Sequence, residues 1–141
     1  RLLEIQNGSL AAEGTWCHAT PGIEPGCVLL STPQTPDILV NDSLEQVCVF
    51  LMQHTKDGSV GIMLNRPTSQ MFGNKKGGLR FQIQGAPPTL QEVFTNNRVY
   101  MGGDVAQQVI HMVHPYEIPG CVPIVPGIYM GGEAAAADMV Q

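Results

Sequence analysis

The hydrophobic pattern of this chain centres on two apolar runs, Val47–Met52 and Val60–Leu64, which flank a polar stretch containing Asp57-Gly58. Asp-Gly between two β-prone runs is typical of a hairpin turn, because Gly reaches a positive φ without a Cβ clash. Each run is apolar at consecutive positions, which predicts central strands covered on both faces. Asn65-Arg66-Pro67 ends the second run, since a proline cannot donate to a strand ladder. We therefore expect a central hairpin here.

Shorter β-prone segments surround this hairpin and are separated by Gly and Pro residues. We expect further strands at Gly26–Thr32, Leu79–Ile83, Arg98–Met101, Val109–Val113, Cys121–Val125 and Ile128–Met130. The rest of residues 68–88 shows little periodicity and predicts a long surface loop. The chain is thus expected to be rich in short strands.

Two short helices are expected after this loop. Thr89, with Glu92 three residues later, forms a capping box for a helix at Leu90–Phe94. The alanines of Ala134–Gln141 favour a helix at the other end. Residues 1–6 predict a short helix or an arm, residues 7–14 a loop, and the stretch up to residue 25 an irregular extended segment.

Composition narrows the class of protein. The 141 residues suffice for one domain, and 16 Gly with 11 Pro indicate many turns. A net charge of −5 argues against direct contact with nucleic-acid phosphates, which requires a surface rich in Lys and Arg. The apolar runs are shorter than the roughly 18 residues that span a bilayer. We expect no transmembrane segment and at most a peripheral association with a membrane.

The four cysteines are Cys17, Cys27, Cys48 and Cys121. None forms the close Cys-x-x-Cys pair of a zinc or redox site, so no metal and no cofactor is expected. Cys48 lies inside a strand run and is interpreted as a small buried hydrophobe. Cys17 and Cys27 flank a turn-rich stretch and could pair if oxidised.

Four motifs come in a fixed order along the chain: Gly26–Pro33 (GCVLLSTP), Gly58–Pro67 (GSVGIMLNRP), Val99–Gly103 (VYMGG) and Pro126–Gly132 (PGIYMGG). Together they resemble the YqgE/AlgH family, also called DUF179 or UPF0301. The resemblance implies an α+β fold in which an antiparallel-rich, bifurcated sheet folds into a pseudo-barrel with short flanking helices. Residues 1–25 would be an N-terminal extended arm, and residues 26–141 the family domain.

The N-terminal part of the chain suggests where in the cell the protein is located. Thr15-Trp16-Cys17-His18 and Glu24-Pro25-Gly26-Cys27-Val28 look like the plant and algal plastid branch of the family, which implies a chloroplast protein. Gln46-Val47 replaces the basic and hydroxyl residues that are usual in the family, and Asp104 replaces a Pro after the Gly-Gly pair. The family's C-terminal signatures are absent. A sheet edge is therefore expected to be open to a partner chain or to the remainder of a longer polypeptide.

The polar candidates for catalysis or binding are His54, His111, His114, Asn65, Arg66 and Asp104. His54 is expected to be a solvated or capping residue in the hairpin tip. His111 and His114 are separated by an odd number of strand positions, so they are expected on opposite faces. The sequence contains no Gly-x-Ser-x-Gly nucleophile elbow and no phosphate-loop spacing.

Asn65 and Arg66 are interpreted as structural. A strand-end Asn bonds backbone groups, and Arg66 is expected to pair with an acid such as Asp104 or Glu133. Gly102-Gly103 is interpreted as a tight turn. The residues of the structural or possible binding motif are His54, Gly58, Gly61, Asn65, Arg66, Pro67, Tyr100, Gly102, Gly103, Gly131 and Gly132.

The function expected from these observations is that of a non-catalytic interaction protein. The paucity of charge and the lack of a catalytic constellation favour a peripheral subunit or an assembly or regulatory factor. Its protein partner would be a larger plastid complex, such as a photosynthetic one. Two alternatives stay open: an enzyme that uses the Asn65-Arg66 and Gly102-Gly103 region, and an indirect transcriptional regulator.

Overall fold

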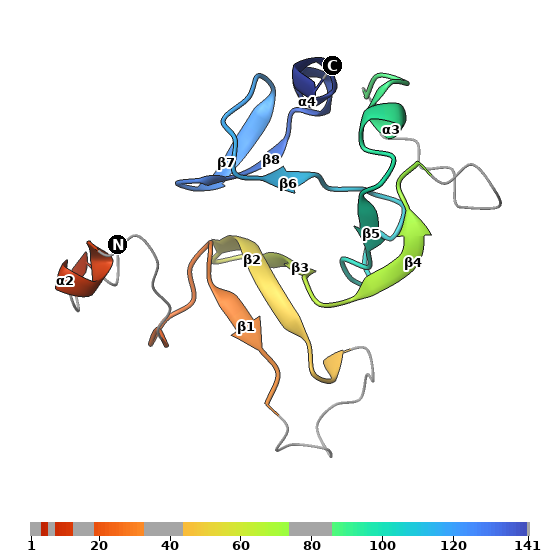
Figure 1. Cartoon of the computed structure of the whole chain (residues 1–141). Coiled ribbons are helices and arrows are strands. Elements are labelled where there is room, and N and C mark those ends of the chain that lie inside the picture. The colour runs from red at the N-terminus through yellow and green to blue at the C-terminus, as the bar shows by residue number, and fades with distance from the viewer. Residues whose placement is uncertain (1–3, 6–7, 13–18, 33–43, 74–85, 141) are drawn as a thin grey trace.

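A computed structural model describes residues 4–5, 8–12, 19–32, 44–73 and 86–140 of the chain (Figure 1). The strands form three antiparallel sheets, ordered β1-β2-β3, β4-β5 and β6-β8-β7. The elements are α2 (Gly8–Ala11), β1 (Val28–Leu30), β2 (Cys48–Thr55), β3 (Gly58–Met63), β4 (Pro67–Met71), α3 (Leu90–Val93), β5 (Arg98–Tyr100), β6 (Val113–His114), β7 (Cys121–Val125), β8 (Ile128–Gly131) and α4 (Glu133–Val140). The expected α+β class is confirmed.

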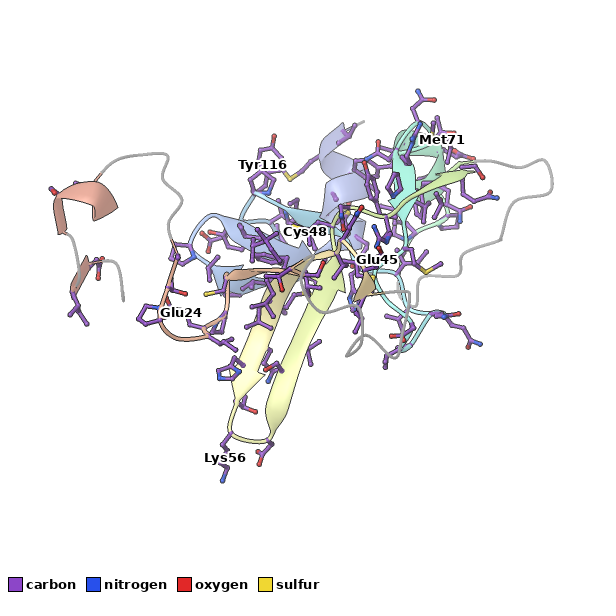
Figure 2. All side chains as sticks on the ribbon, turned by 90° about the horizontal axis from the view of Figure 1, so that it is seen from below. Glu24, Glu45, Cys48, Lys56, Met71 and Tyr116 are labelled. Atoms are coloured by element: carbon purple, nitrogen blue, oxygen red, sulfur yellow. The ribbon has the colours of Figure 1, made fainter. Side chains whose placement is uncertain are left out.

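The central hairpin is formed by β2 and β3, and its strands are longer than the apolar runs alone predict. Thr55 pairs with Gly58, so only Lys56 and Asp57 form the turn, and Gly58 has the expected positive φ, at 146°. Figure 2 shows Lys56 at the tip, where the hairpin projects away from the other elements. The polar residues next to the turn also belong to β2 and β3, because the two-residue turn keeps the two strands in register.

Burial changes along the hairpin. Phe50 and Leu51 point to opposite faces of β2 and are only 5% and 2% exposed, so the base is covered on both sides. Beyond a register shift after Leu51 the strands are exposed, and Val60 is 51% accessible. The expectation that both faces are covered is therefore right for the base and wrong for the outer half.

Strand β1 is shorter than the predicted Gly26–Thr32 and lies at the edge of the first sheet, next to β2. Val28, Leu29 and Leu30 are 50%, 40% and 69% exposed. Three consecutive large apolar side chains at an edge are unusual, because natural edge strands are commonly guarded by charges or prolines.

The second sheet contains a strand that the sequence did not predict. Residues of β4, with the sequence PTSQM, fell within the expected surface loop. Pro67 pairs with Tyr100 and Met71 with Arg98, while the Thr68 hydroxyl donates to the Val99 carbonyl over 2.7 Å. This polar segment becomes a strand because a neighbouring strand supplies partners for its backbone. The strand expected at Leu79–Ile83 lies outside the described residues.

The third sheet confirms the strands at β7 and β8 and corrects the expectation at Val109–Val113. Only Val113 of that segment belongs to a strand, because Val109 bonds the Ala106 carbonyl in a turn (2.9 Å) and the pairing with β8 starts at Val113. Pro123 is tolerated within β7 because β7 is an edge strand.

Helices α3 and α4 confirm the two predicted helices and pack against each other. Leu90 and Ala137, which are 2% and 0% exposed, belong to this packing core. The predicted capping box is wrong, because Thr89 is itself αR and its side chain makes no cap bond. Its carbonyl instead accepts from the Glu92 and Val93 amides. Helix α2 also replaces part of the loop expected at residues 7–14.

The predicted pseudo-barrel is not found as such. Within the described parts of the chain the strands fall into three separate sheets, and none of them closes on itself. Nor does any helix in these parts have the length and apolar character needed to cross a bilayer.

Candidate functional site

The Asn65-Arg66-Pro67 motif lies where β3 leaves the first sheet and β4 begins the second. The Asn65 side chain spans two backbone groups at the start of β2. Its Oδ1 accepts from the Cys48 amide at 2.9 Å, and its Nδ2 donates to the Gln46 carbonyl at 2.8 Å. The amide thus acts as a short piece of strand ladder. Because both its donor and its acceptor are engaged, Asn65 ties the two strands of the hairpin at their base.

The neighbouring Arg66 acts on the same segment. Its guanidinium donates to the Gln46 carbonyl at 3.5 Å and to the Glu45 carbonyl. The expected pairing with a carboxylate, Asp104 or Glu133, is not among these bonds, which go to backbone carbonyls. Its predicted role as a fixed structural donor agrees with these bonds.

The residue held by both side chains has an unusual backbone. Gln46 has φ of +49°, a left-handed conformation that costs a residue with a Cβ roughly 1–2 kcal/mol. Two side chains from the motif fix its carbonyl and so hold this conformation. Gln46 was noted in the sequence only as a departure from the family pattern, and Glu45 was not noted, because nothing in their identity signals a left-handed backbone or a contact with the motif.

The Tyr100–Gly103 segment comes to the same junction. The Met101 amide donates to the Arg66 carbonyl, and the Met63 amide donates to the Gly102 carbonyl, both over 2.8 Å. These two bonds attach the segment after β5 to the end of β3 and thereby join the first and second sheets. The structure thus brings together Asn65, Arg66, Pro67, Tyr100, Gly102 and Gly103, which we name the motif junction.

Gly131 and Gly132 lie elsewhere, where β8 passes into α4. Both have a positive φ, of 89° and 76°. A Cβ on Gly132 would stand 2.8 and 2.9 Å from side-chain atoms of Ile118, which is itself buried. The Gly132 carbonyl accepts from the Ala136 amide and so belongs to the first turn of α4.

His114 adjoins this second glycine pair. Its Nε2 lies 2.8 Å from the Gly131 carbonyl oxygen, which requires that nitrogen to carry the proton, and its ring stacks on Tyr129 with centroids 6.3 Å apart. The Tyr129 hydroxyl donates to Glu117 at 3.5 Å. The His114 Nδ1 is buried and lacks a hydrogen-bond partner. His111 is exposed and lies outside any strand, so the expected opposite placement on one strand is wrong.

The remaining predicted residues are spread along the hairpin. His54 pairs with Ser59 across the strands, with Nδ1 and Oγ 2.7 Å apart, while Gly58 follows the turn as the first residue of β3. A Cβ on Gly61 would approach the Val49 side chain to 2.7 Å. These three residues therefore serve the hairpin and do not join the motif junction.

The described cysteines do not assemble into a site. Cys27, Cys48 and Cys121 are free and half-buried. Cys17, with which Cys27 could pair if oxidised, lies outside the described residues. Across the described ranges no group of His, Cys, Asp or Glu has the arrangement of a metal site. Figure 2 labels Cys48, whose backbone amide is bonded to Asn65.

The comparisons with known proteins agree with the motifs. A family model described as AlgH-like, DUF179, matches residues 29–141. A UPF0301 protein of Chlorobaculum tepidum is 25% identical over 113 residues, which cover 79% of this chain and 51% of the relative. A UPF0301 protein of Bacteroides fragilis is 28% identical over 109 residues, covering 77% and 47%. The chain spans about half the length of these relatives.

One solved structure supports the fold. The solution structure of the AlgH protein from Pseudomonas aeruginosa, a UPF0301 protein, aligns with a TM-score of 0.50 at 18% identity. The alignment covers 82% of this chain and 57% of that one. The resemblance to the family inferred from the four motifs is confirmed.

Proposed function

The chain belongs to the AlgH-like DUF179 family, and from that premise we propose that it is a non-catalytic interaction protein that docks on a larger protein complex. The observation that carries the proposal is that the polar side chains of the motif junction bond the chain's own backbone. Asn65 and Arg66, its most chemically capable side chains, are engaged by backbone groups of the chain itself. These side chains stabilise the connection between the first and second sheets and are not directed at a substrate.

Exposed apolar surface supports the same proposal. Val28, Leu29 and Leu30, which are consecutive in β1, are 50%, 40% and 69% exposed. Neighbouring exposed apolar side chains of this kind are a common feature of surfaces that a partner covers. The charged residues that normally prevent nonspecific association make up only 13% of the sequence.

A plastid location is part of this proposal and rests on the resemblance of the N-terminal part to the plastid branch. The relatives compared above are bacterial. The partner in a plastid would be a photosynthetic or similar complex, to which the chain contributes as a peripheral subunit or an assembly factor.

Affinity capture of the tagged chain from a native extract of its source, followed by native mass measurement, tests this function. The proposal expects a complex of defined stoichiometry that survives in the Asn65→Asp variant, because that residue lies in the scaffold and not in the docking surface. Recovery of the chain without any protein partner, but with a bound small molecule, would contradict the proposal.

An enzyme that uses the motif junction is the second candidate, favoured by one feature. The half-buried Arg66 donates two of the five N–H groups that a guanidinium carries, which leaves donors for an anionic ligand. Thermal unfolding in the presence of phosphate and of small carboxylates tests this candidate. A stabilisation that disappears in Arg66→Gln would favour the enzyme over the interaction protein.

A further inference from the structure

Strand β1 has an outer edge whose backbone groups point away from the sheet. Three bonds fix which residues face β2: Gly26 to Leu51, Leu51 to Cys27, and Ser31 to Val47. In an antiparallel pair, alternate residues exchange both of their bonds with the partner strand. Leu29 lies between these bonds and pairs with Val49, so the N–H and C=O groups of Leu29 point toward β2.

The residues on either side of Leu29 therefore face outward. Val28 and Leu30 direct their N–H and C=O groups away from β2, and β1 is the last strand of its sheet. None of the described segments pairs with this edge. A strand that adds here would meet two donors and two acceptors at the spacing of a sheet ladder, together with apolar side chains on both faces.

Charge specifies what kind of strand fits. Residues 19–32 contain Glu24 and no Lys or Arg, and Glu45 precedes the strand that pairs with β1. Neither carboxylate forms an ion pair with any residue in the described ranges, and Figure 2 labels both of them. The chain as a whole carries a net charge of −5. A second copy would bring the same acidic groups together, whereas a strand flanked by basic residues would be attracted.

We propose that the outer edge of β1 binds an extended partner segment by strand addition, and that this segment has alternating apolar residues flanked by Lys or Arg. The backbone of Val28 and Leu30 supplies the hydrogen bonds, the exposed side chains of β1 contact the apolar residues, and Glu24 and Glu45 attract the basic flanks. This names the class of partner for the docking function proposed above and rests on that function.

A defined peptide makes the test possible without the natural partner. The probe is a capped peptide with alternating Val and Thr in its centre and a pair of Lys residues at each end. Its control carries N-methyl groups on the amides that would donate to β1, so its side chains and charge are unchanged. We expect the 141-residue chain to bind the probe and to bind the control about tenfold more weakly, the loss that one or two backbone hydrogen bonds produce.

Variants of one residue separate backbone pairing from apolar contact. Leu30→Pro removes an N–H that no β2 bond uses, while Leu30→Ala keeps the N–H and removes the exposed side chain. Binding should fall about tenfold in Leu30→Pro and only a few-fold in Leu30→Ala. Circular dichroism and a melting curve confirm that both variants remain folded. If Leu30→Pro unfolds, the N-methylated peptide decides alone.

Three outcomes would overturn the inference: equal binding of probe and control, equal binding by wild type and Leu30→Pro, or self-association of the chain through β1. Failure here is distinguishable from failure of the proposed function. A complex captured from native extract that persists in Leu30→Pro would keep the docking function and reject this edge. A wild-type chain that binds neither the peptide nor a complex from the extract would reject both.

Discussion

The tetrapeptide Tyr-Met-Gly-Gly occurs twice, at residues 100–103 and 129–132, and the two copies have opposite structural roles. In the second copy both glycines have positive φ, and Gly132 lies against Ile118. In the first copy a Cβ on Gly102 would be 3.8 Å from the nearest atom, and one on Gly103, which also has a positive φ of 156°, would meet nothing within 4 Å. The backbone of the first copy is bonded to the end of β3, through Met63 and Arg66.

This difference shows that a short motif does not carry its own structural meaning. In the second copy only glycine fits the positive φ of residue 132 and the space beside Ile118. In the first copy the constraint comes from the Asn65-Arg66-Pro67 segment, which positions the strand end that the copy bonds to. Alanine substitutions of Gly132 in the second copy and of Gly102 in the first should therefore have very different effects on stability.

The largest effect is expected for Gly132→Ala. The alanine would be held at a φ of 76°, and its Cβ would lie 2.8 Å from a side-chain atom of Ile118, so backbone strain and overpacking act together. We expect a loss of about 3 kcal/mol in the free energy of unfolding, measured by urea denaturation. A loss below about 1 kcal/mol would show that the turn into α4 relaxes freely.

Asn65→Ala should have the next largest effect, because it removes the external support of the first copy. Two hydrogen bonds to the backbone of Cys48 and Gln46 are lost, which costs about 2 kcal/mol. Asn65→Asp is the matched control, since it keeps an acceptor for the Cys48 amide but replaces the donor by an oxygen that the Gln46 carbonyl repels. Equal losses for Ala and Asp would mean that the Cys48 bond contributes little.

Gly58→Val separates strain from crowding. Gly58 has φ of 146°, as the second glycine pair has positive φ, but a Cβ there meets nothing within 4 Å. We expect a loss of roughly 1 kcal/mol from backbone strain alone, read as a lower melting temperature. An unchanged melting temperature would contradict the two-residue turn of the hairpin.

The smallest effect is expected for Gly102→Ala in the first copy. Its Cβ would make an ordinary contact with Ile62 at 3.8 Å, and its φ is not positive. The free energy of unfolding should change by less than about 0.5 kcal/mol. If Gly102→Ala were as damaging as Gly132→Ala, the contrast between the two copies would be lost.

The sequence predicted what depends on local chemistry. The apolar runs with Asp57-Gly58 predicted the hairpin, and the alanines predicted α4, because turn residues and helix propensity act over a few neighbours. Strand β4 was missed because its polar residues become a strand only through pairing with β5. Val109–Val113 was overpredicted for the converse reason, since β-prone residues there find no strand partner before Val113.

The candidate site was predicted in the same uneven way. Asn65 and Arg66 were recognised as strand-end structural residues, but the partners of Arg66 were sought among carboxylates. Every residue has a backbone carbonyl, so the sequence does not show which carbonyl accepts from Arg66. The left-handed backbone of Gln46 is likewise visible only in the structure. The buried, unpartnered Nδ1 of His114 was likewise invisible, because burial depends on the packing of β6 against β8.

The central claim is that the motif junction holds the fold while the edge of β1 receives the partner. Backbone amide exchange, measured by NMR with and without the Lys-flanked peptide, tests it most directly. Without peptide the amides of Val28 and Leu30 should exchange fast, while those of Leu29 and Leu51, which face inward, exchange slowly. Adding the peptide should slow Val28 and Leu30 selectively. Changes centred on Arg66 and Gly102, with β1 unaffected, would contradict the account and move the binding site to the motif junction.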